Sequence, residues 1–150
     1  NSPGQVVIAG HKAAVERAGE LCKAAGAKRA LPLPVSVPSH CALMKDAAEQ
    51  LALELDKITF NTPTIDVINN VDVAIENSAE AIKTALVKQL YSPVRWTETV
   101  EALAQAGVEN LIETGPGKVL QGLIKRIDKS LVCVAANSTA TVEQAIELVK

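Results

Sequence analysis

Short apolar segments alternate with helix-like segments in the second half of this chain, and this order strongly restricts its fold. Residues 108–113 and 131–135 are apolar runs of strand length. Residues 119–127 and 142–149 carry apolar side chains at the spacing of one helical face. Strands that are connected through helices become parallel neighbours, and helices then cover the sheet. The pattern therefore predicts an α/β fold, with a parallel sheet flanked by helices.

Apolar periodicity predicts further elements along the rest of the chain. It predicts strands at residues 5–9, 30–35 and 64–69, and helices at residues 12–25, 41–56, 79–90 and 96–106. Pro32 and Pro34 make the second of these strands an edge strand or an irregular one. Ser39 lies where the helix over residues 41–56 is expected to be capped.

Composition excludes several classes of function. The chain has 150 residues, enough for one ordinary domain, with a net charge of -2 and 2% aromatic residues. These values argue against a protein that binds nucleic acid by phosphate contacts or base stacking. No apolar run approaches the roughly 20 residues that span a bilayer, so we expect a cytoplasmic protein without a membrane partner. Cys22, Cys41 and Cys133 are widely spaced, which suggests neither a disulfide framework nor a metal site.

His40 is the main candidate for a catalytic residue in this chain. It lies at a predicted strand-to-helix junction. Imidazole is the side chain whose unperturbed pKa lies nearest neutrality, so a histidine at such a junction can take and return a proton. The alternative is a half-exposed, helix-capping histidine without chemistry. Cys41 follows directly and could be a nucleophilic thiol, but adjacent residues on a helix point in different directions.

A glycine-rich turn follows the strand predicted at residues 108–113. Gly115, Gly117 and Lys118 could cradle an anion at the start of the next helix, which leaves a nucleotide-binding α/β protein as one alternative. The turn lacks both the GxGxxG and the GxxxxGK[ST] patterns, and Pro116 removes one N–H donor. A tight turn that places Val119 near a pocket is the better interpretation.

Four stretches give the chain a resemblance to a known family. They are residues 1–10 (NSPGQVVIAG), 35–44 (VSVPSHCALM), 89–96 (QLYSPVRW) and 113–120 (ETGPGKVL). In this order they resemble the C-terminal half of the malonyl-CoA:acyl carrier protein transacylases of bacterial fatty acid synthesis. The resemblance implies that residues 1–36 end a small ferredoxin-like subdomain. It implies that residues 37–150 belong to a large subdomain similar to the α/β-hydrolases.

The resemblance also implies a reaction. Malonyl would pass from CoA to the phosphopantetheine thiol of an acyl carrier protein through an acyl-serine, with no cofactor besides the CoA thioester substrate. No serine of this chain lies in a GxSxG turn, so we expect the nucleophile on an N-terminal segment of the same enzyme. We expect this chain alone to be inactive. An acyltransferase-like fragment with only a binding or structural role stays open as an alternative.

The resemblance assigns roles to particular residues. His40 would be the base, and the backbone carbonyl of Gln89 would orient its ring at a hydrogen-bond distance of about 2.6 to 3.2 Å. His40 would lie at the junction of the two subdomains. Asn1, Ser39 and Val119 are candidates for contact with the substrate. In related polyketide acyltransferases, Phe at the position of Ser39 accompanies malonyl and Ser accompanies methylmalonyl, yet stand-alone malonyl transferases share the Ser.

Two basic pairs are candidates for binding the CoA phosphates or an acidic carrier protein. They are Lys28 with Arg29 and Lys125 with Arg126. Each pair could equally be ordinary solvated surface.

Overall fold

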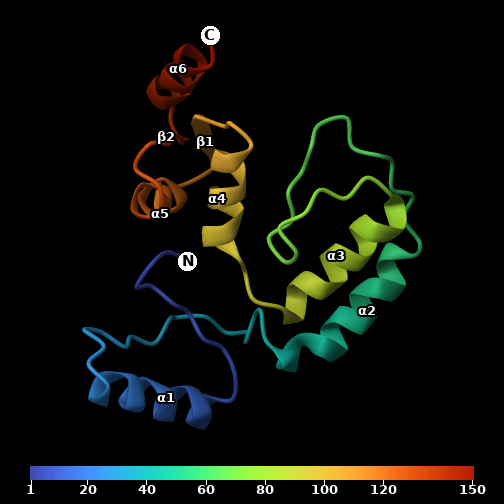
Figure 1. Cartoon of the computed structure of the whole chain (residues 1–150). Coiled ribbons are helices and arrows are strands. Elements are labelled where there is room, and N and C mark those ends of the chain that lie inside the picture. The colour runs from blue at the N-terminus through green and yellow to red at the C-terminus, as the bar shows by residue number, and fades with distance from the viewer. The chain divides into compact units, whose positions relative to one another are not determined.

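The computed structural model describes all residues from 1 to 150, and they form two compact units. The first unit combines Asn1–Val6 with Arg95–Lys150, and the second is Val7–Val94. Figure 1 shows the elements of both units in chain order. The subdomain boundary expected between residues 36 and 37 stays a prediction.

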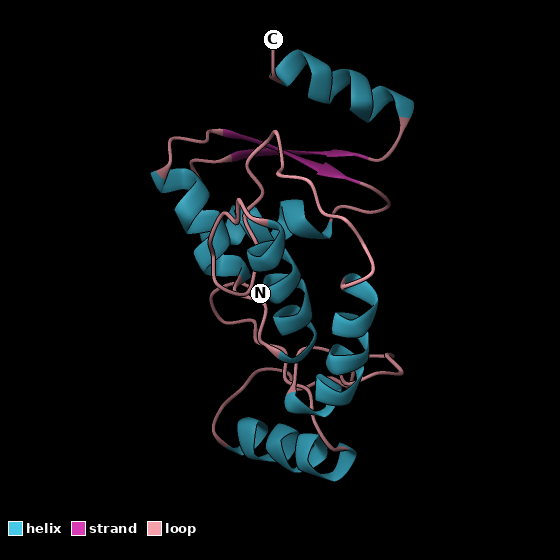
Figure 2. Ribbon diagram, turned by 90° about the vertical axis from the view of Figure 1, so that its right-hand side faces the viewer, coloured by secondary structure: helices cyan, strands magenta, loops and turns pink.

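The first unit is built on a parallel two-stranded sheet. Strands β1 (Asn110–Thr114) and β2 (Val132–Ala136) pair in register from Asn110 opposite Val132 to Thr114 opposite Ala136. Helix α5 (Val119–Ile127) connects them. Helix α6 (Thr139–Leu148) lies on one side of the sheet, and α5 with α4 (Trp96–Gln105) lies on the other (Figures 1 and 2). The expected α/β fold with a parallel sheet and flanking helices is confirmed.

The core of the first unit joins its helices to its strands. Val100 of α4 is fully buried, and Ile124 of α5 and Leu131 at the start of β2 are nearly so. Half-buried side chains that pack against this cluster are Trp96, Ala104, Leu111, Ile127 and Cys133. Apolar burial of this kind holds the layers of an α/β fold together.

The second unit contains helices but no strand. It contains α1 (Lys12–Ala24), a 3-10 turn (Ala42–Met44), α2 (Lys45–Leu55) and α3 (Ala79–Tyr91). Helices α2 and α3 pack against each other, and Figure 1 shows them side by side. None of the helices in the chain has both the length and the apolar content needed to cross a membrane.

Three predicted strands are wrong. Residues 5–9, 30–35 and 64–69 form no strand. Only isolated bridges, Ser2 with Gln5 and Ile68 with Ile75, occur near them. A strand requires a run of hydrogen bonds to a neighbour, and apart from the single bridges at Gln5 and Ile68 these apolar segments have none. Their side chains are accordingly exposed, Val6 to 83%.

The helix predictions at residues 12–25, 79–90, 96–106 and 119–127 are confirmed to within about one residue. The helix expected from residue 41 is α-helical only from Lys45, after the 3-10 turn, and Ser39 does not cap it. The last helix starts at Thr139 and not at residue 142. The reason is a capping box in which Ser138 and Thr141 bond each other's backbone N–H groups.

Candidate active site

His40 lies in the turn that precedes the 3-10 turn of the second unit. Its backbone has φ 62, in the left-handed region that few non-glycine residues occupy. Such a conformation costs about 1 to 3 kcal/mol and persists only where the surrounding structure holds it. Cys41, and not His40, is the N-cap of the 3-10 turn, and the side chain of His40 is exposed. The helix-capping interpretation of His40 is therefore wrong.

Two hydrogen bonds hold His40 against the C-terminal end of α3. Its main-chain N–H donates to the carbonyl of Leu90 at 2.9 Å. Its ring Nδ1 lies 2.9 Å from the carbonyl oxygen of Gln89, which confirms the expected contact. The last carbonyls of a helix have no partner within the helix, so they are free to accept both bonds.

The ring contact decides which nitrogen of His40 can act as a base. A carbonyl oxygen only accepts hydrogen bonds, so the neutral ring must carry its proton on Nδ1. The other nitrogen, Nε2, is then left with a lone pair that can take a proton. Because the partner is a neutral carbonyl, it orients the ring without adding a full negative charge beside it.

The neighbouring Cys41 has a different hydrogen-bond partner. Its Sγ donates to the carbonyl of Pro38 at 3.2 Å, within the same turn. No hydrogen bond joins this thiol to the ring of His40. The geometry thus gives no support to a Cys41–His40 dyad, and the thiol instead stiffens the turn that carries His40.

The glycine turn of the first unit already uses the donors that an anion would need. The carboxylate of Glu113 accepts the N–H groups of Leu120 at 3.0 Å and Gln121 at 2.8 Å, which are the free donors of the first turn of α5. Gly115 and Gly117 have φ 125 and 91, which only glycine adopts readily. An internal carboxylate therefore occupies the place of a phosphate, which argues against the nucleotide-binding alternative.

Glu113 also influences the thiol of Cys133 on β2. Burial of Cys133 raises the pKa of its thiol, and the nearby negative charge of Glu113 raises this pKa further. A thiol with a raised pKa is a poor nucleophile. Cys133 is therefore a packing residue of the sheet.

The structure places the other candidate residues on exposed positions of both units. Asn1, Val119, Lys125 and Arg126 belong to the first unit, and Lys28, Arg29 and Ser39 to the second. Arg126 donates from Nη1 to Oε1 of Gln5 at 2.6 Å, which fixes the guanidinium near the turn at residues 2–5. The contacts that these residues make with substrates stay predictions.

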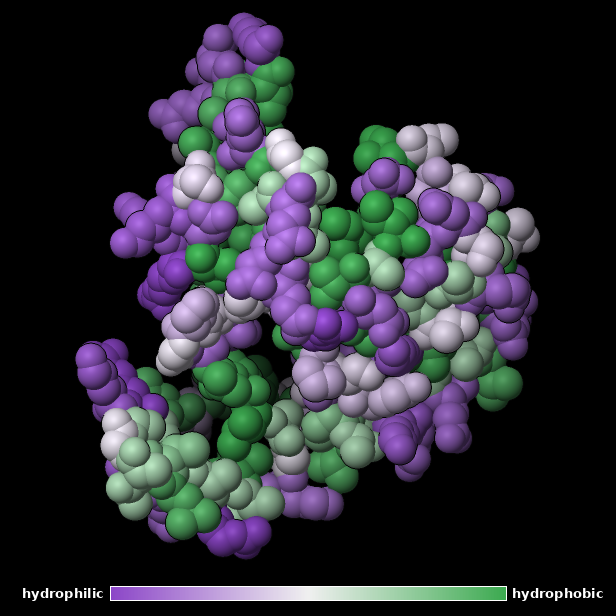
Figure 3. Space-filling view, viewed as in Figure 1, coloured by the Kyte–Doolittle hydropathy of each residue, from purple (hydrophilic) through white to green (hydrophobic).

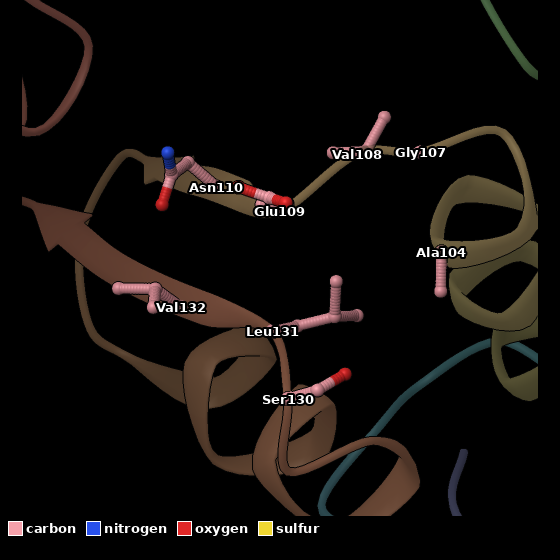
Figure 4. A pocket seen from close by; sticks show the side chains of 8 residues that line it. All are labelled: Ala104, Gly107, Val108, Glu109, Asn110, Ser130, Leu131 and Val132. Atoms are coloured by element: carbon pink, nitrogen blue, oxygen red, sulfur yellow. The ribbon is translucent and has the colours of Figure 1, made fainter.

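A hollow of about 350 Å³ lies at the N-terminal ends of β1 and β2 (Figure 4). The end of α4 and the segments that lead into the two strands line it, and no candidate residue is among them. Ligands of parallel sheets bind at the opposite, carboxyl ends of the strands. The hollow therefore gives no support to the predicted site.

Sequence reasoning missed two groups, one in each unit. The carbonyl of Leu90 and the carboxylate of Glu113 were not anticipated in the roles that the structure gives them. Glu113 lies two residues before Gly115 of the glycine turn, so its position was a usable signal for helix capping. A backbone carbonyl has no signal of its own in the sequence. No three His, Cys, Asp or Glu side chains are grouped in a way that could hold a metal ion.

Comparisons with known proteins agree on one family. A family model described as "Acyl transferase domain" matches residues 1–145. The chain is 67% identical over 148 residues to the malonyl CoA-acyl carrier protein transacylase of Escherichia coli, covering 99% of the chain and 48% of that relative. It is 46% identical to the enzyme of the same name from Bacillus subtilis over 150 residues, covering 100% of the chain and 47% of that relative.

Solved structures give the same result. One is a complex of a type II PKS acyl-carrier protein with its malonyl-transacylase, with a TM-score of 0.91 and 63% identity over 93% of this chain and 45% of that one. Another is an acyl carrier protein S-malonyltransferase from Vibrio cholerae, with a TM-score of 0.87 and 65% identity over 90% of this chain and 44% of that one. The chain spans about half the length of the relatives that it matches.

Proposed function

The chain belongs to the acyl transferase domain family, and from this membership we propose that it forms the C-terminal half of a malonyl-CoA:acyl carrier protein transacylase of fatty acid synthesis. The observation that carries the proposal is the 2.9 Å contact between Nδ1 of His40 and the carbonyl of Gln89. It orients the one exposed group of the site that can act as a base near neutral pH.

The proposed reaction passes through two transfers. Nε2 of His40 takes the proton of a serine hydroxyl supplied by the preceding half, and the serine oxygen attacks the malonyl thioester. When the C–S bond breaks, the imidazolium returns this proton to the sulfur of CoA. The thiol of the carrier protein's phosphopantetheine then gives its proton to His40 and attacks the acyl-serine, which restores the serine hydroxyl. The reaction balances without any cofactor.

The remaining candidate residues would serve binding. Lys125 and Arg126 would contact the acidic carrier protein, and Lys28 with Arg29 would contact it or the CoA phosphates. The solved complex of a related malonyl-transacylase with an acyl-carrier protein supports a carrier-protein partner. Asn1, Ser39 and Val119 would each contact the substrate.

Replacing His40 tests the proposal. The test uses a full-length protein, in which this chain follows the N-terminal half of the Escherichia coli relative. We expect His40→Ala to lower the single-turnover rate of serine acylation by roughly a thousandfold, since the nucleophile loses its base. His11→Ala is the matched control, because His11 is the other histidine of this chain and its side chain makes no capping bond.

An unchanged acylation rate in His40→Ala would remove His40 from the mechanism. The chain by itself should transfer no malonyl, because it has a base without its nucleophile. Transfer from CoA to carrier protein by the purified chain alone would contradict this expectation.

A further inference from the structure

The orientation of His40 depends on the position of the last turn of α3. Both of its hydrogen bonds end on carbonyls there, those of Gln89 and Leu90. The last turn of a helix is the part that frays most easily. Ser92, which follows α3, is already extended and provides no capping bond. Something outside α3 must therefore hold this end in place.

A tight loop over residues 68–75, here named the Asn69 loop, lies beside this end of α3 (Figure 1). The Asn69 side chain shapes it with three hydrogen bonds. Its Oδ1 accepts the N–H groups of Val71 at 3.1 Å and Asp72 at 2.8 Å, and its Nδ2 donates to the carbonyl of Ala74 at 3.0 Å. Val71 is buried and anchors the loop. The loop is thus a rigid structure and not a loose connection.

The conformation of the Asn69 loop is strained at one position. Val73 has φ 56, and a β-branched residue rarely adopts a left-handed backbone. Strain of this kind persists only where surrounding contacts hold it. The bonds of Asn69 on both sides of Val73 supply such contacts, and they fix the backbone from which Asp72 projects.

Asp72 connects this loop to α3. Its carboxylate forms an ion pair and hydrogen bond with the ammonium of Lys88. Lys88 directly precedes Gln89, so the ion pair acts on the same helical turn whose carbonyls hold His40. Both side chains are partly exposed, and such pairs add little to overall stability. We therefore expect the ion pair to affect the position of the last turn of α3 more than the overall stability.

We propose that Asn69, Asp72 and Lys88 are positioning residues that fix the last turn of α3 and thereby the orientation of the His40 ring. The inference rests on the proposed function only in making His40 the base. Loss of the Asp72–Lys88 ion pair, or of the Asn69 bonds that fix its loop, lets the carbonyls of Gln89 and Leu90 move. This movement weakens both bonds to His40. Small displacements of a catalytic group lower the rate of the chemical step more than they affect substrate binding.

The test measures the full-length protein in two ways. Hydrogen exchange of the His40 amide, followed by NMR, reports the bond to Leu90 without any activity. The single-turnover acylation rate reports the orientation of the His40 ring, and the KM for malonyl-CoA reports substrate binding. We expect Asp72→Asn and Asn69→Ala each to speed exchange at His40 by roughly tenfold and to slow acylation by a similar factor. The KM should change by less than about twofold.

Asp56→Asn is the matched control. It removes the other ion pair of α3, between Asp56 and Lys83 at 3.7 Å, which lies farther from the end of the helix. It should leave both measurements at His40 unchanged. Exchanging the charges, with Asp72→Lys and Lys88→Asp together, should restore most of the rate that either change alone removes.

The proposal is overturned if Asp72→Asn leaves exchange at the His40 amide unchanged, or if Asp56→Asn changes it as much. Failure of the proposed function has a different signature. In that case His40→Ala leaves acylation unaffected, while exchange of the His40 amide still reports whether the Asp72–Lys88 ion pair holds the last turn of α3.

Discussion

The two regions that carry the candidate residues are built in different ways. In the β1–α5–β2 region, each element is adjacent in sequence to the next, and a buried apolar cluster of Val100, Ile124 and Leu131 holds them together. Around His40, the deciding contacts join residues 49 and 50 positions apart, and backbone carbonyls accept both bonds. The sheet region thus depends on apolar burial, and the His40 region on directed polar contacts. Substitutions in the two regions should accordingly change different measured properties.

The largest expected effect on stability comes from the sheet region. Ile124→Ala should lower the free energy of unfolding of the first unit by about 2 to 4 kcal/mol, since it leaves a cavity beside Val100. Denaturant unfolding followed by amide exchange in β1 and β2 measures this loss. Val132→Ala, at an exposed strand position, is the control and should cost far less. Equal losses for the two changes would show that this cluster is not the core.

A smaller effect is expected at the basic pair on α5. Lys125→Ala combined with Arg126→Ala in the full-length protein should raise the KM for carrier protein by roughly tenfold and leave single-turnover acylation nearly unchanged. Added salt should weaken binding of the unaltered protein, because exposed charges are screened. Lys129→Ala, another exposed cation just after α5, serves as the control. If neither the substitutions nor added salt changes this KM, Lys125 and Arg126 are ordinary solvated surface residues.

The smallest expected effect concerns Cys133. Glu113→Gln removes the negative charge that raises the pKa of this thiol, so the pKa should fall, although burial continues to hold it above its ordinary value. A larger thiolate fraction at mildly alkaline pH should speed alkylation of Cys133 by a few-fold. Exposed Cys22 provides the internal reference. An unchanged ratio of the two alkylation rates would contradict the assigned influence of Glu113.

The same contrast explains what the sequence could and could not predict. The strands at 108–113 and 131–135 and the helix between them follow from local apolar patterns, and the structure confirms them. The segments at 5–9, 30–35 and 64–69 have equally apolar patterns, but no strand lies next to them. Apolar residues alone cannot supply a pairing partner, so a local pattern overpredicts strands.

The site shows a similar division. His40 was identifiable because few side chains in this chain can exchange protons near neutral pH. Its contact with the carbonyl of Gln89 could be predicted only from the family resemblance. Every residue has the same backbone carbonyl, so the sequence itself gives no signal for this contact. The left-handed backbone of His40 and the Asp72–Lys88 ion pair depend on how α3 and the Asn69 loop come together. Neither has a local signature in the sequence.

The central claim is that the carbonyl of Gln89 keeps the proton of neutral His40 on Nδ1 and leaves Nε2 free as the base. Long-range ¹H–¹⁵N NMR of the neutral ring tests this directly. His40→Gln identifies the signals. We predict a protonated Nδ1 and an unprotonated Nε2 in the full-length protein. A proton on Nε2, or rapid averaging between the two nitrogens, would contradict the account.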